Sequence, residues 1–339
     1  MQSTSFSQII LYARQHRVTS GVYETLQRLI SAWKTCSGFT LFLESETAKH
    51  FSQYPQVSNI PVLPTEKFEK NSLLVVIGGD GSLLSAARLA VQKEIPIIGI
   101  NRGHLGFLTS IAPDEAEKKL NEVFQGAYEE EPRFLLSACI RKNEKLPGLE
   151  SSLDVLKNVM TRTKGNLEGT TPVFEKHPMT TPGRVIYEGL ALNDIVLTQG
   201  DAPFMIEFDV FDHKALISHY RADGLIVATP TGSTAYALSG GGPIVHPTMD
   251  AITLVPMFPH TLSSRPIVVS AQNTLHIYLQ AKNESPCRVI FDGQEHQDIE
   301  ADSWIDIEKY PKKLRLLQPL SYNYYETLRS KLGWEAPNF

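Results

Sequence analysis

The chain is 339 residues long, which is enough for about two domains. Its composition, 42% hydrophobic and 20% charged, allows a large buried core and excludes a mainly disordered, collagen-like or coiled-coil protein. The formal net charge of −5 leaves no overall positive field, so we expect no nonspecific binding of nucleic acid or of an anionic membrane.

The first third of the chain alternates between strand-like and helix-like segments. Apolar runs typical of buried strands occupy 8–13, 40–43, 72–77 and 95–100, and apolar residues at helical spacing occupy 21–33, 83–91 and 113–124. This alternation predicts a doubly wound, Rossmann-like α/β domain with a parallel sheet, which we place at residues 1–131.

Short β-like runs replace this pattern after Pro132, and several of them alternate with a period of two. Ile206 and Phe208, for example, face the opposite way from Glu207 and Asp209. The runs are 133–140, 186–198, 205–211, 215–220, 267–270, 275–279, 288–291, 305–308 and 314–317. They predict an all-β, sandwich-like domain, largely antiparallel, over residues 132–320.

Two further segments differ from both domains. Residues 142–184 mix Lys, Glu, Thr, Pro and Gly with little periodicity, which favours a long solvated insertion, with a lid or an oligomer arm as the alternative. Residues 321–339 include a stretch of helical period at 322–332. This predicted C-terminal helix can return to the first domain.

Cys36, Cys139 and Cys287 lie far apart in the sequence and form no CxxC pair, which argues against a disulfide framework or a structural zinc site. The chain does not open with a basic segment followed by an apolar run, and no stretch approaches about 18 uninterrupted apolar residues. We therefore expect neither a signal peptide nor a membrane span, and a cytoplasmic location.

A glycine-rich loop, Gly78-Gly79-Asp80-Gly81-Ser82, stands between a buried-type strand and a helix. Glycines let backbone N–H groups approach an anion, and the start of the helix adds orphan donors and a partial positive charge, so the loop is typical of a phosphate site. A carboxylate beside phosphate needs a function, such as accepting a proton from a hydroxyl group, and Asp80 therefore indicates phosphoryl transfer. The alternative is a plain turn in which Asp80 only caps the helix.

Asn101 opens a second glycine-containing loop, 101–108, directly after a strand. Open α/β sheets bind ligands at the carboxyl ends of their strands, so we expect this loop and the Gly78 loop to face one crevice. Asn101 and the glycines are the ligand-side candidates there, whereas Phe107 and Leu108 are expected in the core.

Three polar segments mark the second half of the chain. Residues 223–243 combine clustered hydroxyl groups, backbone N–H groups and one aromatic ring, which suits ribose, amide or adenine recognition but is also typical of plain turns. Asn193 and Asp194 stand at the start of an apolar strand, either as ligand contacts or as an Asx turn. The third segment, 292–294, is interpreted as a hairpin turn.

In this order, the motifs resemble those of the NAD kinase family. The resemblance rests on residues 78–81, 101–108, 192–194, 223–243 and 259–266, and it spans most of the chain. The GGDG loop alone is shared with diacylglycerol-type lipid kinases and phosphofructokinases, whereas the TPTGSTAY block is typical of NAD kinases. A lipid or sugar kinase with the same loop, and a dinucleotide sensor without catalysis, are the alternatives.

The resemblance implies a homo-oligomer, dimer or tetramer, that uses ATP and a divalent metal such as Mg²⁺ to phosphorylate the 2′-hydroxyl group of the adenosine ribose of NAD. Asp80 would be the base that activates this hydroxyl, and Asp223 would contact the nicotinamide amide. The phosphate loop would comprise Gly78, Gly79, Ser82 and Asn101. The dinucleotide would contact Asp80, Gly81, Asn193, Asp194, Arg221, Asp223, Thr234, Ala235, Tyr236, Ala237, Leu238, Ser239 and Gln294.

The chain departs from the family pattern at a few positions. The family more often has Glu at the position of Asp194. The Asp side chain is shorter but should still form hydrogen bonds. Gly240 and Val255 replace a more common Ala and Thr. Phe204 occupies a position that is basic in some members, which leaves that contact unsupported in this chain.

Overall fold

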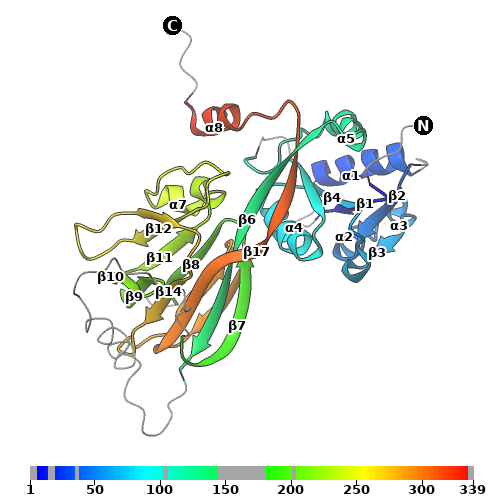
Figure 1. Ribbon diagram of the computed structural model, residues 1–339. Coiled ribbons are helices and arrows are strands. Elements are labelled where there is room, and N and C mark those ends of the chain that lie inside the picture. Colours follow the sequence, from blue (N-terminus) through cyan, green and yellow to red (C-terminus); the bar gives the residue numbers. More distant parts are fainter. Residues whose placement is uncertain are drawn as a thin grey trace, which may run out of the picture. The chain divides into compact units, whose positions relative to one another are not determined.

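The computed structural model describes residues 6–13, 20–34, 38–101, 106–143, 181–200 and 204–334 (Figure 1). The chain forms two compact units: unit 1 comprises Met1–Phe134 and Pro311–Phe339, and unit 2 comprises Leu135–Tyr310. The chain passes between the units inside two long strands, β6 (Tyr128–Lys142) and β17 (Ser303–Pro319). The domain limits expected from the sequence were 131/132 and 320/321.

Unit 1 is built on a parallel sheet in the order β17-β5-β4-β1-β2-β3. The strands besides β17 are β1 (Gln8–Tyr12), β2 (Thr40–Glu44), β3 (Val62–Leu63), β4 (Ser72–Ile77) and β5 (Pro96–Ile100). The helices are α1 (Ser20–Trp33), α2 (Ser45–His50), α3 (Pro55–Ser58), α4 (Asp80–Lys93), α5 (Ala116–Phe124) and α8 (Tyr324–Leu332), with a 3-10 turn η1 (Thr65–Lys67).

Helices cover both faces of this sheet (Figure 1). Alternate residues of a strand point to opposite faces, so a continuous apolar run such as β4 supplies two cores. Leu73 and Val75 of β4 belong to a cluster that includes side chains of α1 and α5. On the other face α4 packs so closely that a Cβ at Gly99 would lie 2.7 Å from Leu83 Cδ1. The predicted doubly wound α/β domain is confirmed.

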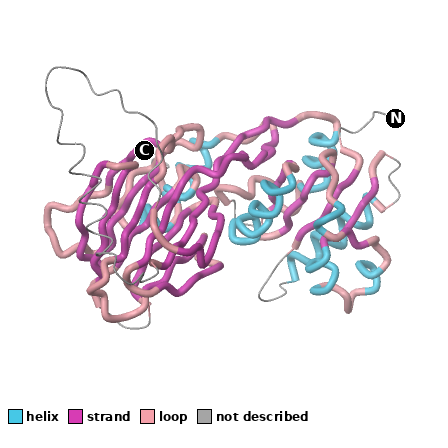
Figure 2. Tube along the Cα trace, turned by 60° about the horizontal axis from the view of Figure 1, so that its bottom comes forward, coloured by secondary structure: helices cyan, strands magenta, loops and turns pink. Residues whose placement is uncertain are grey.

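Unit 2 contains two antiparallel sheets, and Figure 2 shows that strands dominate it. One sheet has the order β10-β9-β14-β17, with β6 pairing β17 and β7 pairing β6. The other has the order β13-β12-β11-β8-β15-β16. The strands are β7 (Arg184–Ala191), β8 (Asp194–Gln199), β9 (Ile206–Asp212), β10 (Ala215–Ala222), β11 (Gly224–Ala228), β12 (Ala251–Met257), β13 (Ile267–Ser270), β14 (Leu275–Leu279), β15 (Cys287–Phe291) and β16 (Glu295–Ile299).

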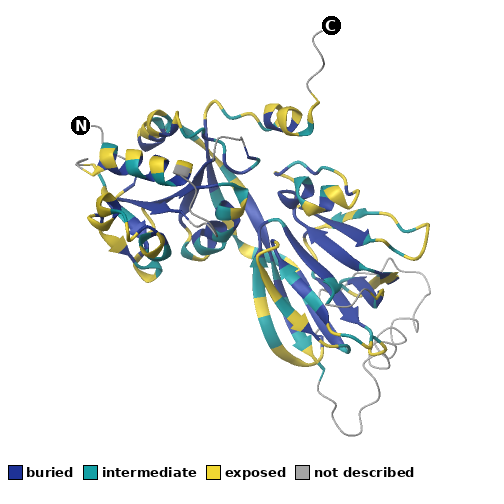
Figure 3. Cartoon of the chain, turned by 180° about the vertical axis from the view of Figure 1, so that it is seen from behind, coloured by how far each residue is buried: buried dark blue, intermediate teal, exposed yellow. Residues whose placement is uncertain are grey.

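The two sheets pack face to face through buried strand residues (Figure 3). The Phe291 ring of β15 lies against β7, with its centroid 5.5 Å from the ring centroid of Tyr187. A Cβ at Gly189 of β7 would lie 2.6 Å from Phe291 Cε1. The all-β, sandwich-like prediction for this half is confirmed. A 3-10 turn η2 (Gly232–Thr234) and a short helix α7 (Tyr236–Ser239) are the remaining named elements described in this unit.

Several predicted boundaries were wrong. The single run at 186–198 is two strands, β7 and β8, separated by Leu192 and Asn193. The runs at 305–308 and 314–317 are one strand, β17, because the charged stretch around Pro311 continues the extended chain. The short elements α2, α3 and β3 and the strands β12 and β16 were missed. Most of the predicted insertion, 144–180, lies outside the described residues.

Candidate functional site

The glycine-rich loop joins β4 to α4 in unit 1. Gly79 precedes the helix in extended conformation (φ −86°, ψ −177°), and Asp80 is the first helical residue. Gly78 has no room for a side chain, because a Cβ there would lie 2.4 Å from the Ser82 hydroxyl oxygen. Gly81 is exposed. The tight turn thus places the N-terminal end of α4, with its partial positive charge, at the end of a buried strand.

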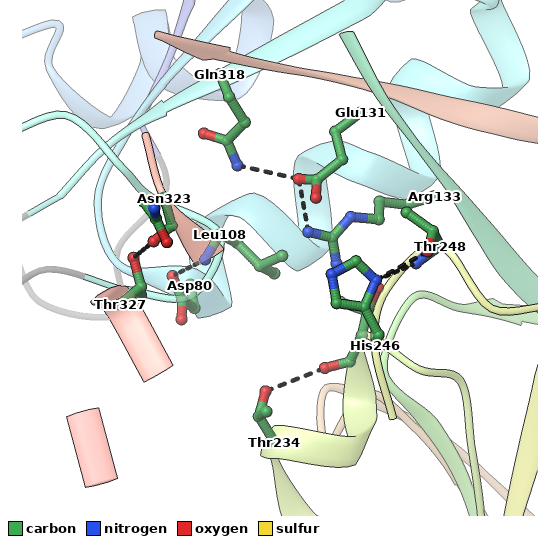
Figure 4. A network of polar contacts seen from close by, with 11 residues as sticks. Asp80, Leu108, Glu131, Arg133, Thr234, His246, Thr248, Gln318, Asn323 and Thr327 are labelled. Atoms are coloured by element: carbon green, nitrogen blue, oxygen red, sulfur yellow. Dashed lines mark hydrogen bonds and ion pairs between the residues drawn. The ribbon is translucent and has the colours of Figure 1, made fainter. Parts of the chain in front are cut away.

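The Asp80 carboxylate is held by the loop that follows β5. Its Oδ1 accepts hydrogen bonds from Leu108 N (3.3 Å), from Thr109 N (3.2 Å) and from the Thr109 hydroxyl (3.0 Å). Its Oδ2 accepts one from Phe107 N (3.0 Å). We call these four donors the Asp80 cradle; Figure 4 shows the Leu108 contact. The interpretation of Asp80 as a plain helix cap is wrong, since its carboxylate accepts its hydrogen bonds from residues 107–109 of another loop.

Two glycines allow the Asp80 cradle to close. A Cβ at Gly106 would lie 2.1 Å from Asp80 Oδ1 and 2.4 Å from Thr109 Oγ1. A Cβ at Gly99 would lie 2.8 Å from the Thr109 methyl carbon. Thr109 is fully buried, so its packing against Gly99 directs its hydroxyl group at Asp80. The two loops that were expected to face one crevice are joined through the Asp80 carboxylate.

The other residues of these loops have mixed environments. Asn101 is buried, and its N–H donates to Ile111 O at 2.9 Å, so its backbone continues the strand pairing beyond β5. Ser82 is half-buried. Leu108 is buried, as the core prediction required, whereas Phe107 is only half-buried. The predicted phosphate-loop residues therefore all lie at the ends of β4 and β5.

The segment Leu192-Asn193-Asp194, the 192–194 turn, joins β7 to β8 in unit 2, and all its backbone polar groups are bonded. The Asp292 carboxylate accepts hydrogen bonds from Leu192 N (3.0 Å), Asn193 N (2.7 Å) and Asp194 N (3.4 Å). Leu192 O accepts from the Thr229 hydroxyl at 2.6 Å, and Asn193 O accepts from Thr229 N at 2.8 Å. Asp194 O accepts from Asp292 N at 3.0 Å. The turn is fixed on both sides.

The Asp194 carboxyl group is buried beside a second carboxylate. It is 4% exposed, and no residue in the described part of the chain donates a hydrogen bond to it. Burial, and then the negative charge of Asp292, raise the pKa of Asp194 to about 7. A buried carboxyl group without a protein partner, with a pKa near neutrality, is typical of a ligand-binding position.

The TPTGST sequence packs against the 192–194 turn. A Cβ at Gly232 would lie 2.0 Å from Asn193 O, and Gly232 N donates to Thr229 Oγ1 at 3.1 Å. The Ser233 hydroxyl donates to Pro230 O at 2.6 Å and accepts from Val245 N at 3.0 Å. The hydroxyl groups of Thr229 and Ser233 therefore hold the local fold, which is the turn-forming alternative for this part of the block.

The predicted dinucleotide contacts at 234–239 differ in exposure. Tyr236 is 51% exposed and Ser239 is exposed, whereas Thr234, Ala235 and Leu238 are half-buried. The Thr234 hydroxyl donates to Thr231 O at 3.3 Å. Ala237 is fully buried in a cluster of sheet residues, so its side chain faces the protein. Tyr236 and Ser239 offer the accessible side chains of this segment.

The structure does not bring all the predicted contacts of unit 2 together. In the pairing of β11 with β8, Ala228 lies opposite Asp194 and Gly224 lies opposite Thr198. Asp223 therefore lies at the far end of β11 from Asp194, about 17 Å away along an extended strand. Arg221 belongs to the preceding strand, β10, where it pairs with Glu207 of β9. Gln294 is exposed in the turn after β15, at the Asp194 end.

Sequence reasoning missed two residues, Thr109 and Asp292. Thr109 directly follows the 101–108 loop, and its position after that motif was the available signal. Asp292 was interpreted only as part of a hairpin turn, and it does occupy one: Asp292 and Gly293 both have positive φ (53° and 65°) between β15 and β16. Its carboxylate bonds to residues about a hundred positions earlier, which no local pattern reveals.

The part of the chain that the structure describes contains no group of three or more His, Cys, Asp or Glu side chains placed to hold a metal ion. Mg²⁺ commonly binds substrate phosphates and water, with only one or two carboxylates from the protein. Within the same described ranges, no helix is long and apolar enough to cross a membrane.

Two family models match the chain: the ATP-NAD kinase N-terminal domain at residues 15–128 and the ATP-NAD kinase C-terminal domain at residues 192–318. A protein named NAD kinase from Legionella pneumophila (strain Corby) is 44% identical over 332 residues, covering 98% of this chain and 97% of the relative. One from Coxiella burnetii (strain Dugway 5J108-111) is 42% identical over 331 residues, covering 98% and 95%.

Two solved structures share the fold. Yeast NADH kinase complexed with NADH aligns with a TM-score of 0.76 at 22% sequence identity, covering 100% of this chain and 90% of the yeast chain. An NAD kinase from Archaeoglobus fulgidus in complex with ATP aligns with a TM-score of 0.59 at 23% identity, covering 96% and 97%.

Proposed function

Since the chain belongs to the NAD kinase family and is therefore a phosphotransferase that converts NAD to NADP, we propose that Asp80 is the base of this reaction and that the Asp80 cradle orients it. Family membership decides against the lipid or sugar kinase and against the non-catalytic sensor.

The unequal bonding of the two Asp80 oxygens carries this proposal. Oδ1 accepts three hydrogen bonds from Leu108 and Thr109, whereas among the described donors only Phe107 N reaches Oδ2. Each carboxylate oxygen has about two acceptor positions. Oδ2 therefore keeps capacity for one more donor, and we assign that position to the 2′-hydroxyl group of the adenosine ribose.

In the proposed reaction, Asp80 Oδ2 accepts the hydroxyl proton as the ribose oxygen forms a bond to the γ-phosphorus of ATP. The bond between that phosphorus and the bridging oxygen breaks, and ADP leaves with the electron pair. Phosphoryl transfer passes through a loose transition state, so orientation of the hydroxyl group matters more than the strength of the base. A carboxylate held by four donors is suited to orientation.

The phosphates of ATP are assigned to the glycine-rich loop of unit 1. Gly78 and Gly79 allow a close approach of phosphate to the backbone, and the start of α4 favours negative charge. The reaction also needs neutralisation of phosphate charge, which a Mg²⁺ ion bound with ATP supplies. We propose Mg²⁺ dependence, with the ion held by the ATP phosphates and water.

Recognition of NAD is assigned to unit 2. Asn193 and Asp194 project from a turn whose backbone is fully bonded, which makes them the best-ordered candidates. Tyr236 offers an exposed ring for stacking, and Gln294 lies at the same end of the sheet. Arg221 and Asp223, the latter at the nicotinamide amide, are assigned only by their place in the family motif.

Three further expectations from the family remain proposals: a cytoplasmic location, a homo-oligomer of two or four subunits, and a division of labour between an α/β phosphate domain and a β-rich NAD domain. Light scattering of the purified chain measures its mass in solution. A monomer under all conditions of activity would contradict the oligomer.

The direct test of the proposed reaction is product identification. The purified protein is incubated with ATP, Mg²⁺ and NAD, and phosphorus NMR locates the new phosphate. We expect NADP with its phosphate on the 2′ oxygen, and loss of turnover when a chelator removes the metal. Phosphorylation at the 3′ oxygen would contradict the assignment to Asp80, and full activity in the chelator would contradict the metal requirement.

A further inference from the structure

The hairpin turn between β15 and β16 contains a negatively charged residue, Asp292, that its conformation does not require. Phe291 pairs with Glu295, so residues 292–294 connect the strands, and Asp292 and Gly293 are the central residues of a β-turn closed by Gln294 N and Phe291 O. Turns with positive φ at both central positions accept Asn-Gly as readily as Asp-Gly. In this chain the first position is Asp292, which is only 9% exposed and lies beside the buried Asp194 carboxyl group. Asp at this position places a second negative charge next to Asp194, and the conformation of the turn does not explain why Asp rather than Asn is present.

The bonding of the Asp292 carboxylate explains it. Oδ1 accepts hydrogen bonds from Asn193 N at 2.7 Å and from Asp194 N at 3.4 Å, and Oδ2 accepts one from Leu192 N at 3.0 Å. Both oxygens are therefore used as acceptors for N–H groups of the 192–194 turn. An Asn side chain has only one oxygen, and its NH₂ group would face a backbone N–H group.

We propose that Asp292 is a positioning residue for dinucleotide recognition, whose carboxylate fixes the 192–194 turn and thereby directs the Asn193 and Asp194 side chains toward NAD. This inference rests on the proposed role of these two side chains in NAD binding. The opposite side of the turn is bonded to Thr229, so Asp292 completes the backbone bonding of all three residues. Removing one partner of a buried hydrogen bond leaves an unsatisfied group, which the turn avoids only by moving.

Asp292 also sets the charge state of its neighbour. The pKa of Asp194 is raised by burial and by Asp292, which is the only charged group described as acting on it. The paired strands contribute Ala228 of β11 and Phe291 of β15 beside this end of β8, and neither side chain titrates. Removing the charge of Asp292 should therefore lower the pKa of Asp194 and move its titration to lower pH.

The test is steady-state kinetics of the full chain carrying Asp292→Asn. The substituted residue retains the turn, since Asn tolerates positive φ. We expect the KM for NAD to rise about tenfold while the KM for ATP stays within about twofold, because only one substrate depends on the 192–194 turn. The inflection of kcat/KM for NAD that belongs to Asp194 should move to lower pH.

Asp292→Glu separates position from charge, and it also serves if Asp292→Asn does not fold. It keeps the charge and both acceptor oxygens but shifts them by one methylene group. We expect a raised KM for NAD with the pH inflection unchanged. Gly293→Ala is the matched control: its φ of 65° strains the same turn, but a Cβ there meets nothing within 4 Å, so stability should fall without a change in either KM.

A wild-type KM for NAD in both Asp292 variants would overturn the inference. Asn193→Ala distinguishes this failure from a failure of the proposed function. If Asn193→Ala raises the KM for NAD and the Asp292 variants do not, the NAD site stands and the role of Asp292 falls. If Asn193→Ala also leaves the KM unchanged, the assignment of NAD to the 192–194 turn is itself wrong.

Discussion

The two units use the same bonding pattern at their functional turns, and they differ in how far the carboxylate is exposed. In unit 1, Asp80 accepts hydrogen bonds from the N–H groups of three consecutive residues, 107–109. In unit 2, Asp292 accepts them from three consecutive residues, 192–194.

The difference lies in the exposure of the carboxylate and in one additional donor. At Asp80, which is half-buried, the Thr109 hydroxyl is the fourth donor to the carboxylate and the third to Oδ1, and Oδ2 retains a free acceptor position. At Asp292, Oδ1 accepts two donors and Oδ2 accepts one, and the group is nearly buried. One anchored carboxylate is thus left available to a substrate, whereas the other serves the backbone. Bonding to N–H groups alone therefore does not identify a catalytic carboxylate.

Asp80→Asn should have the largest effect. The amide cannot accept a proton, and its NH₂ group would face N–H donors of the cradle, so we expect kcat to fall by about 10²–10⁴-fold. Steady-state NADP formation measures this. Asp114→Asn, at an exposed position, is the charge-matched control and should retain wild-type activity. Near wild-type turnover of Asp80→Asn would show that unit 1 also holds only a structural carboxylate.

Gly106→Ala should have the next largest effect on activity. A Cβ at this position would lie 2.1 Å from Asp80 Oδ1, so the loop must move and the Asp80 cradle opens. We expect a fall in kcat of about a hundredfold, as for misplacement of a catalytic group, with NAD affinity unchanged. Isothermal titration with NAD and turnover assays test the two parts. Gly21→Ala, where a Cβ meets nothing within 4 Å, controls for the added methyl group.

Thr109→Val should have a smaller effect. The methyl group that replaces the hydroxyl removes one of four donors to Asp80, while the backbone N–H of residue 109 stays in place. We expect kcat to fall about tenfold with little change in the KM for NAD, since a hydrogen bond to a charged group is worth about 1.5–3 kcal/mol. Thr109→Ser restores the donor and should recover most of the activity; equal losses in both variants would indicate a packing effect instead.

Asp194→Asn tests the buried carboxyl group of unit 2 through the pH dependence of the free energy of unfolding. The folded pKa of Asp194, about 7, lies above the ordinary value of 3.8, so the folded state binds the extra proton between these values. Its contribution to stability therefore falls as pH rises from about 4 to about 7, by at most about 1.4 kcal/mol per pH unit. Urea unfolding at pH 5, 6 and 7 should show the variant gaining stability relative to wild type as pH rises. A constant difference would contradict the raised pKa of Asp194, which burial and then the charge of Asp292 produce.

Local sequence patterns were enough to predict the elements around the site. The glycine-rich loop after an apolar run predicted the turn from β4 into α4, and the Asp-Gly pair predicted the turn after β15. Tertiary contacts were not predictable. Thr109 reaches Asp80 only because two loops meet, and Asp292 reaches Leu192 only because β8 and β15 pair.

Some errors in the predicted strand boundaries had local causes. The run at 186–198 was predicted as one strand because the apolar pattern continues through Leu192, although Asp292 and Thr229 bond the backbone there and define a turn. The two runs at 305–317 were separated because Pro311 lies among charged residues, yet β17 continues through them. Proline lacks an N–H donor, but it does not prevent extended backbone.

A double-mutant cycle on Asp80 and Thr109 tests most directly whether the cradle acts through the carboxylate. NADP formation is measured for wild type, Asp80→Asn, Thr109→Val and the double variant at saturating ATP and NAD. We predict that Thr109→Val costs about tenfold in the wild-type chain but about twofold or less once Asp80 is Asn. The same tenfold loss in both backgrounds would show that Thr109 acts independently of Asp80 and would contradict the proposed orientation of the base.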